Sequence, residues 1–244
     1  MTESNFVLEL SKLGIEITEK QKDQFQRYYE LLVEWNEKIN LTAITEKEAV
    51  YLKHFYDSAT IIKSIDLSAV ESLCDIGTGA GFPGIVLKIL YPNLDVTLID
   101  ALEKRIKFLN IVIDELGLEK INTIHARSEE YGKTNREIFD VVTARAVAPL
   151  PILIEYCVPL VKEHGYFIPL KANISQEILE SKGAIAKLEL SMLEKIEFEL
   201  PIEKSHRTII KFMKNKPKMC RELSKIVYYF WLTILYCKCY NYIT

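Results

Sequence analysis

The stretch "SLCDIGTGAGFPGIVLKIL" (72–90) places four glycines between a short apolar run and a helical pattern. Glycines in a strand-to-helix turn let the backbone come close to a nucleotide-like ligand. A plain tight turn needs only one or two of them. Three glycines at alternate positions, with Asp75 two residues before the first, therefore indicate a ligand-binding loop.

Short β-rich runs and helical patterns alternate after this loop, which predicts βαβ units and a parallel sheet. With 72–77, the runs are 95–100, 121–126, 139–144 and 165–171, and the helical patterns are 84–91, 102–116, 149–162 and 175–193. The runs at 194–201 and 207–214 have no helix between them, which suits an antiparallel pair. We expect an α/β fold with a mostly parallel seven-stranded sheet and a reversed strand near its end.

The first seventy residues have a helical pattern instead. Leu31, Leu32, Trp35 and Ile39 form an amphipathic face, and Thr18 or Thr45 could cap a following helix. We therefore divide the chain into a helical N-terminal cap, an α/β domain and a tail. Their expected bounds are 1–68, 69–215 and 216–244.

The tail is atypical, because "IVYYFWLTILYC" (226–237) is strongly apolar but too short to span a bilayer. We interpret it as a non-native or poorly packed extension, such as a frame disruption in the source gene would produce. A docked helix and a membrane-surface anchor are the alternatives. A metal site at Cys237 and Cys239 is disfavoured, because no matching Cys or His cluster accompanies them.

Composition narrows the class of protein. The chain has 244 residues, 49% of them hydrophobic and 27% charged, which is typical of a globular protein outside the membrane. Five cysteines without framework spacing favour a reduced, cytoplasmic setting, and the first residues do not resemble a secretory leader. The net charge of −3 argues against uniform polyanion binding but leaves room for a local basic face.

Two ligand classes fit the glycine loop. Gly79, Gly81 and Gly84 match the dinucleotide pattern, whereas Gly77, Gly79 and Gly81 with Asp75 match motif I of the S-adenosylmethionine (SAM) methyltransferases. Pro83 lies where a pyrophosphate would need backbone N–H donors, so it disfavours a dinucleotide.

SAM has no phosphate, and its sulfonium and ammonium groups suit a nearby carboxylate such as Asp75. Asp100, at the end of the second strand, suits a ribose diol in either case. We therefore expect SAM as the cofactor and a Rossmann-like class I SAM-dependent methyltransferase. An NAD-dependent oxidoreductase is the weaker alternative.

The absence of two known motifs limits which atom this chain is expected to methylate. Enzymes that methylate adenine amino groups carry an Asn/Asp-Pro-Pro-aromatic box after the fourth strand, where this chain has "TARAVAPLP" (143–151). Methylation at pyrimidine C5 needs a cysteine nucleophile, and Cys157 lies within a helical pattern that predicts a core position. A nucleophile that needs little activation remains, such as guanine N7.

The span from about Tyr28 to Lys214 resembles the glucose-inhibited division protein B family, the bacterial 16S rRNA (guanine-N7) methyltransferases. The matching words are "LLVEWNEKINLTAI" (31–44), "HFYDS" (54–58), "CDIGTGAGFPG" (74–84), "ARSEE" (126–130), "TARAVAPL" (143–150) and "PLK" (169–171). The resemblance implies a helical cap on a SAM fold, acting on a guanine in the decoding-region loop of small-subunit rRNA. A small-molecule methyltransferase and a non-catalytic SAM-binding assembly factor are the alternatives.

The resemblance also assigns residues. Gly77 and Phe82 match cofactor positions, and Ser128 with Glu129 would meet the adenine. Arg145, at the end of the fourth strand, would pair the SAM carboxylate or donate to guanine, and the strand-end position supports this independently. A surface salt bridge is the plainer interpretation. Lys171 is a second catalytic candidate and a phosphate or base contact; here Ala172 replaces the glycine that usually follows.

Further substrate contacts are expected around this site. His54 and Asp57, three residues apart, would line the pocket mouth or brace the cap against the sheet. The segment 204–225, which includes Arg207, carries eight Lys or Arg residues against one Glu and predicts a basic edge for RNA phosphates. We expect a monomer that acts on 16S rRNA or the small ribosomal subunit, without a metal and without membrane association.

Overall fold

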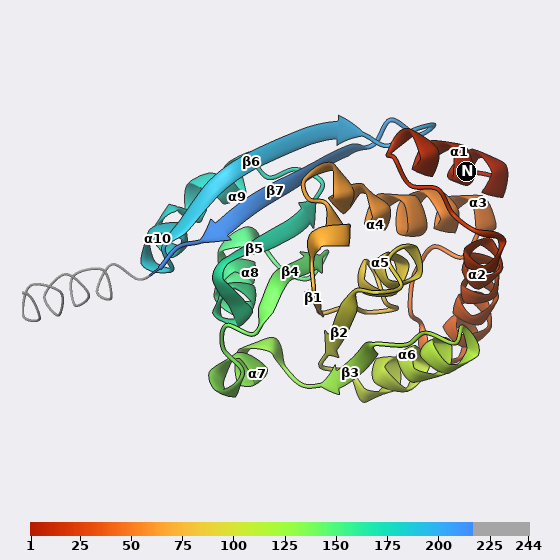
Figure 1. The fold of residues 1–244 in the computed structure, drawn as a ribbon, viewed down its shortest axis with the longest axis horizontal. Helices are drawn as coiled ribbons and strands as arrows, with labels where there is room; N and C mark the ends of the chain where they lie inside the picture. The colour runs from red at the N-terminus through yellow and green to blue at the C-terminus, as the bar shows by residue number, and fades with distance from the viewer. Residues whose placement is uncertain (217–244) are drawn as a thin grey trace, which may run out of the picture.

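The computed structural model describes residues 1–216. Within them, seven strands form one sheet in the order β3-β2-β1-β4-β5-β7-β6 (Figure 1). The strands are β1 (Ser72–Ile76), β2 (Asp95–Asp100), β3 (Ile121–His125), β4 (Phe139–Arg145), β5 (Val161–Lys171), β6 (Leu190–Glu199) and β7 (His206–Lys214). All neighbours pair in parallel except β7, which runs antiparallel to both β5 and β6. The predicted sheet with a reversed strand near its end is confirmed.

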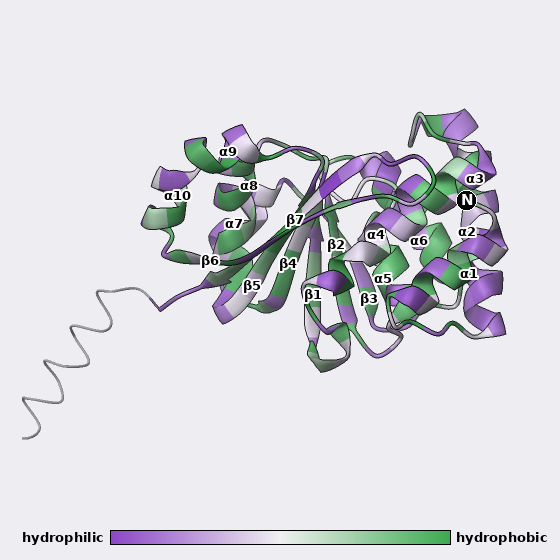
Figure 2. Cartoon of the chain, turned by 90° about the horizontal axis from the view of Figure 1, so that it is seen from above, coloured by the Kyte–Doolittle hydropathy of each residue, from purple (hydrophilic) through white to green (hydrophobic). Residues whose placement is uncertain are grey.

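Helices cover both faces of the sheet (Figure 1). One face carries α5 (Gly84–Leu90) and α6 (Glu103–Glu115) together with the N-terminal helices, and these share one apolar core. The other face carries α7 (Ser128–Thr134), α8 (Leu150–Cys157), α9 (Ser175–Glu180) and α10 (Lys182–Lys187) over a second core. Figure 2 shows the apolar residues concentrated on the strands and on the helix surfaces that face them.

The N-terminal region is helical, as expected. Its long helices are α1 (Glu3–Lys12) and α2 (Glu19–Ile39). A continuous helical segment follows, made of α3 (Lys47–Val50), a π-helical stretch (Tyr51–Tyr56), α4 (Asp57–Ala59) and a 3-10 turn (Thr60–Lys63). Leu31 and Leu32 are buried on the predicted face of α2. Thr18 caps α2 as expected, but Glu46 and not Thr45 caps α3, because the Glu46 carboxylate reaches two backbone N–H groups of that helix.

Several predicted bounds on the second face were wrong. The helix expected over 149–162 ends at Cys157, because Pro159 cannot continue it, and β5 begins at Val161. The first residues of β5 join β4 through an irregular register. The helix expected over 175–193 is two short helices followed by β6 from Leu190. The helix α7 was not foreseen, because seven residues give too little apolar periodicity.

None of the helices within residues 1–216 is long and apolar enough to cross a bilayer. Cys74 and Cys157 are both free and fully buried, so the core position expected for Cys157 is confirmed. The apolar stretch 226–237 and most of the predicted tail lie outside the described residues, as do Cys237 and Cys239.

Candidate functional site

A crevice opens at the carboxyl ends of β1, β2 and β4, where the strand order reverses between β1 and β4. In open α/β sheets ligands bind at this point. Two adjoining cavities of about 640 and 420 Å³ make up the crevice, and both are lined by Gly77, Arg105 and Ala146. We call them the inner cavity, which faces the N-terminal helices, and the outer cavity, which lies beside α7.

The glycine loop after β1 forms the floor between the cavities. Gly77 and Gly81 both have positive φ, 62° and 100°. A Cβ on Gly77 would come within 2.6 Å of the Val147 side chain, and one on Gly81 would come equally close to Ile85 and the Tyr28 hydroxyl. Backbone conformation and close packing therefore both require glycine here. Gly79 has φ 62°, and a Cβ there would meet only a backbone oxygen 4.0 Å away, so its surface is open to the crevice.

Asp75 is buried beneath this loop and lines neither cavity. Its Oδ2 accepts hydrogen bonds from Thr78 Oγ1 at 2.6 Å and from the Gly84 backbone N–H at 2.8 Å. Its Oδ1 has no partner. Burial raises the pKa of this carboxyl to about 7, against the lowering effect of the two hydrogen bonds. The contact expected between Asp75 and a cofactor cation is replaced by a structural one, in which Asp75 anchors the loop to the start of α5.

Asp100, at the end of β2, holds the other side of the loop. Its Oδ2 accepts from the Gly79 N–H at 2.9 Å and from Arg105 Nη1 at 3.1 Å, and its Oδ1 accepts from the Leu102 N–H at 2.9 Å. A carboxylate has about four acceptor positions, so Oδ1 keeps room for one more donor. Asp100 lines the outer cavity with Ser128 and Glu129, as the sequence predicted.

Phe82 lies between the loop and the N-terminal helices. The His54 ring stacks on it, with centroids 4.5 Å apart, and the Arg145 guanidinium lies 5.2 Å from its ring centre. Burial, followed by the charge of Arg145, lowers the pKa of His54 to about 3. His54 is therefore a neutral ring at physiological pH, and its Nε2 lies 2.9 Å from Thr42 Oγ1.

Asp57 joins two arginines across the inner cavity. Its Oδ2 accepts from Arg145 Nη1 at 3.1 Å, and its Oδ1 accepts from Arg207 Nε at 2.9 Å. Arg145 also donates to the Lys53 carbonyl at 2.9 Å and contacts His54 Nδ1 at 3.3 Å. Asp57, Arg145 and Arg207 come from α4, β4 and β7, and Lys53 and His54 from the π-helical stretch, so the cap and both halves of the sheet meet here. His54 and Asp57 both line the cavity and brace the cap, which unites the two roles weighed for them.

Lys171, at the end of β5, lines the inner cavity but is already paired. Its Nζ lies 2.7 Å from Glu177 Oε2 and donates to the Ala148 carbonyl at 2.8 Å. Its side chain is 11% exposed. Five Lys or Arg side chains and two carboxylates line the inner cavity, which gives it a positive balance. They are Lys53, Arg105, Arg145, Lys171 and Arg207, against Asp57 and Glu177.

In the described part of the predicted basic edge, 204–216, most cations already have partners, whereas Lys204 is exposed and Lys216 lies 3.8 Å from Glu163. Arg207 pairs with Asp57, Lys211 donates to the Ser64 carbonyl at 3.0 Å, and Lys214 donates to the carbonyls of Val158 and Val161. The cause is the position of β7, which lies between β5 and β6, so that most of its residues are buried. The rest of that segment, 217–225, lies outside the described residues.

Two residues at the junction of the cavities were missed from the sequence. Arg105 lines both cavities while its guanidinium pairs with Asp100. Ala146 also lines both and has φ 57°, a conformation that costs energy in a non-glycine residue and is frequent at binding sites. The five-residue spacing from Asp100 to Arg105 was a usable signal. The sequence carries no signal for the backbone of Ala146.

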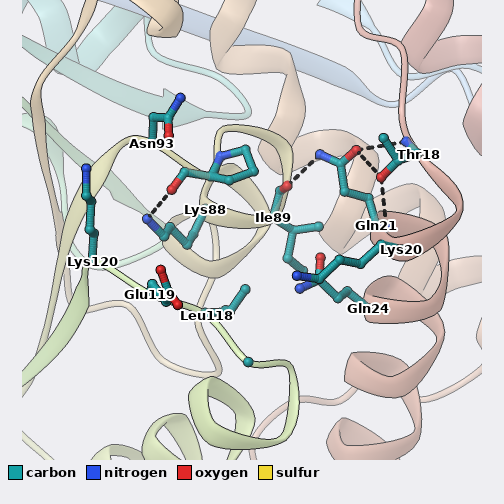
Figure 3. A pocket seen from close by; sticks show the side chains of 12 residues that line it. Thr18, Lys20, Gln21, Gln24, Lys88, Ile89, Asn93, Leu118, Glu119 and Lys120 are labelled. Atoms are coloured by element: carbon teal, nitrogen blue, oxygen red, sulfur yellow. Dashed lines mark hydrogen bonds between the residues drawn. The ribbon is translucent and has the colours of Figure 1, made fainter.

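A separate cavity of about 520 Å³ lies at the amino ends of β2 and β3 (Figure 3). Gln21 Nε2 donates to the Ile89 carbonyl at 2.7 Å, and the buried Lys88 donates to the carbonyls of Pro92 and Leu94. These side chains satisfy the backbone at the end of α5 and in the turn after it. We therefore regard this cavity as a joint between the cap and the sheet.

The crevice fits SAM on its own chemistry. The open surface of Gly79, the spare acceptor position on Asp100 and the cation of Arg145 offer partners for an adenosine and an amino-acid carboxylate. Residues 1–216 contain no group of three His, Cys, Asp or Glu residues placed to hold a metal ion.

Known proteins resemble this chain closely. The family described as "GidB: rRNA small subunit methyltransferase G" matches residues 21–206. A protein of Lysinibacillus sphaericus named ribosomal RNA small subunit methyltransferase G is 52% identical over 219 residues, which is 88% of this chain and 92% of the relative. A protein of Lactococcus lactis with the same name is 48% identical over 223 residues, or 89% and 94% of the two chains.

Solved structures with low sequence identity share the fold. The YcgJ protein of Bacillus subtilis superposes with a TM-score of 0.53 at 13% identity, over 67% of this chain and all of that one. A SAM-dependent O-methyltransferase of Thermotoga maritima gives a TM-score of 0.51 at 17% identity, over 76% of this chain and 72% of that one. At these identities the likeness supports the fold alone. It agrees with the predicted Rossmann-like class I architecture.

Proposed function

Because this chain belongs to the GidB family of rRNA small subunit methyltransferase G proteins, we propose that it methylates N7 of a guanine in 16S rRNA, with SAM as the methyl donor. The observation that carries the proposal is the crevice at the β1–β4 switch point, with a glycine loop on one side and a positively lined cavity on the other. We further propose that the target lies in the decoding-region loop.

We assign a different ligand to each of the two cavities. Gly77, Asp100, Ser128 and Glu129 line the outer cavity and would hold the adenosine, together with Gly79 of the same loop, which lines the inner cavity. Gly81 and Phe82 shape the loop toward the inner cavity, and Asp75 supports that loop from below. When bound, SAM supplies a methyl group on a positively charged sulfur.

The inner cavity would receive the guanine. Its N7 carries a free lone pair in the neutral base, so the site needs no general base. Arg145 supplies hydrogen-bond donors that would position the base at the wall of this cavity, and Lys171 and Arg207 add positive charge for the RNA backbone. His54, neutral and stacked on Phe82, keeps that wall rigid.

We also propose that the protein works as a cytoplasmic monomer on the small ribosomal subunit or its rRNA, with residues 1–68 acting as a cap on the domain at 69–215. The cap contributes Lys53, His54 and Asp57 to the inner cavity, so the catalytic site needs both parts.

The test is incubation of the full chain with tritiated SAM and 16S rRNA from a strain that lacks the modification, followed by mapping of the labelled base. We expect label on a single guanine at N7. Label on small metabolites but not on rRNA would support a small-molecule methyltransferase instead. SAM binding without transfer to either would support the non-catalytic assembly factor.

A further inference from the structure

The inner cavity contains two carboxylates, Asp57 and Glu177, in a wall otherwise rich in cations. Guanine presents two adjacent donors on its Watson–Crick edge, N1–H and the N2 amino group. A carboxylate can accept both at once, one on each oxygen. Adenine has an acceptor at N1, which such a carboxylate would repel. Enzymes that act on an unstacked base commonly read this edge.

Asp57 retains the acceptor capacity for a two-point contact. Each of its oxygens accepts one hydrogen bond, Oδ1 from Arg207 and Oδ2 from Arg145, so each keeps a free lone pair. The two arginines hold the carboxylate in place, and its side chain is 8% exposed, at the wall of the cavity.

Glu177 does not have the acceptor capacity for such a two-point contact. Its Oε2 accepts from both the Leu150 N–H at 2.6 Å and Lys171 Nζ at 2.7 Å. That oxygen is saturated, so Glu177 can give a guanine edge one oxygen at most.

The order in which the strands place these residues matches the order of the polar atoms around a guanine. Asp57 lies between Arg207 on β7 and Arg145 on β4, and the glycine loop follows β1, the neighbour of β4 on the side away from β7. Around guanine the polar atoms run N2, N1, O6, N7. A base that gives N2 and N1 to Asp57, with O6 toward Arg145, therefore turns N7 toward the loop that would hold the methyl donor. Arg145 has N–H groups left for O6, because Nε and one hydrogen of Nη2 are unused in its bonds to Asp57, Lys53 and His54.

We propose that Asp57 selects guanine, by accepting N1–H and N2–H of the target base and so directing its N7 toward the cofactor. The proposal deepens the proposed function and rests on it. Asp57 is then a substrate contact that determines specificity, in addition to holding Arg145 and Arg207.

The test compares guanine with inosine, which lacks only the N2 amino group, at the target position of a synthetic rRNA substrate. The full-length wild type, Asp57→Asn and Glu177→Gln are assayed for kcat/KM on both, and their SAM affinity is measured separately. We expect the wild type to prefer guanine by about tenfold or more, because inosine loses one of the two hydrogen bonds to the charged carboxylate. Asp57→Asn should bring the ratio of kcat/KM on guanine to kcat/KM on inosine close to one. Glu177→Gln should keep the wild-type ratio, even if it lowers both values.

Equal rates of the wild type on guanine and inosine would overturn the proposal without any variant. An unchanged guanine-to-inosine ratio in Asp57→Asn would also overturn the proposal. The intrinsic reactivity of the two bases is the same for both enzymes, so it cancels when the ratios of the wild type and the variant are compared. If Asp57→Asn fails to fold, Asp57→Glu keeps the charge but displaces the carboxylate by one methylene, and its ratio should still fall. A wild type that binds SAM but methylates neither RNA would contradict the proposed function itself, not the choice of Asp57.

Discussion

Arg145 is the residue at which the inner cavity, the cap and the sheet meet. Its guanidinium contacts Asp57, the Lys53 carbonyl, His54 and the face of Phe82. It is 13% exposed, at the wall of the inner cavity. One side chain thus joins the cap to the cavity wall.

We predict that Arg145→Ala lowers kcat/KM for rRNA methylation by about a hundredfold, because the contacts that position Asp57, His54 and the entering base are lost, and a displacement of about 1 Å at the reacting atoms can cost that much. The measurement is tritium transfer from SAM under single-turnover conditions, with circular dichroism to verify folding. Arg136→Ala is the matched control, since Arg136 is exposed on the surface and lines neither cavity. Full activity in folded Arg145→Ala would remove this residue from the mechanism.

The raised pKa of Asp75 predicts that the stability of the folded protein depends on pH. Its folded-state pKa of about 7 lies above the ordinary value near 3.8, so the folded chain binds the proton more readily. The stability from this group is therefore complete below about pH 3.8 and is lost as the pH rises through 7. Asp75→Asn mimics the neutral acid and can still accept from Thr78 and Gly84. Its stability relative to the wild type should increase between pH 5 and pH 8, measured by urea unfolding.

Asp75→Ala separates charge from hydrogen bonding at the same position. It leaves the buried Gly84 N–H and the Thr78 hydroxyl without their acceptor, which costs about 1–3 kcal/mol. We expect this variant to be less stable than Asp75→Asn at every pH. A stability difference between Asp75→Asn and the wild type that does not change with pH would show that the carboxyl keeps an ordinary pKa.

At the scale of elements, α2 depends on its first turn. The Thr18 hydroxyl accepts from the Gln21 N–H at 3.3 Å, and the Gln21 side chain accepts from the Thr18 N–H at 2.8 Å. Gln21 also donates to the Ile89 carbonyl of α5, so this capping box fixes the cap to the sheet as well as starting the helix.

We predict that Thr18→Ala lowers the free energy of unfolding by about 1 kcal/mol, the usual value of an N-cap. Thr45→Ala is the control, because Glu46 caps α3, and we expect a change within about 0.5 kcal/mol. Both are measured by denaturant unfolding at pH 7. Equal losses in the two variants would mean that threonine packing, not capping, explains the effect.

At the scale of the whole molecule, the cap contacts the glycine loop directly. The buried Tyr28 of α2 donates from its hydroxyl to the Ala80 carbonyl in the glycine loop at 2.5 Å, and its ring stacks on Phe55. Trp35 packs near Phe108 of α6, with ring centroids 6.2 Å apart. One continuous apolar core therefore joins the N-terminal helices to the first face of the sheet.

This connection predicts that Tyr28→Phe weakens SAM binding about fivefold, because the loop carbonyl loses a donor worth about 1 kcal/mol. Tyr29→Phe is the matched control, since its hydroxyl makes an exposed 3.3 Å contact with the Thr45 carbonyl far from the loop. Isothermal titration calorimetry with SAM measures both. An unchanged affinity in Tyr28→Phe would mean that the loop keeps its shape without the cap.

Local patterns in the chain were enough to predict the α/β class, the seven strands, the reversed strand and the loop at Gly77–Gly81. Alternating strands and helices, and glycines that no other residue can replace, follow from backbone sterics and burial within a few neighbouring residues. Asp100, Ser128 and Glu129 line one cavity, because the carboxyl ends of parallel strands meet at one edge of the sheet; their contact with a cofactor stays a prediction.

The partners of the charged side chains came from the fold instead. Asp57 and Arg207 lie 150 positions apart in the chain, and Arg145 and Asp57 lie 88 apart, so no spacing rule connects them. Asp75 was expected to face the cofactor but supports the loop, and Lys211 and Lys214, in the segment predicted to bind RNA, donate to backbone carbonyls. Whether a charge is free or paired depends on which residues the sheet order brings within about 3 Å, and that is a property of the packed chain, not of its neighbours in sequence.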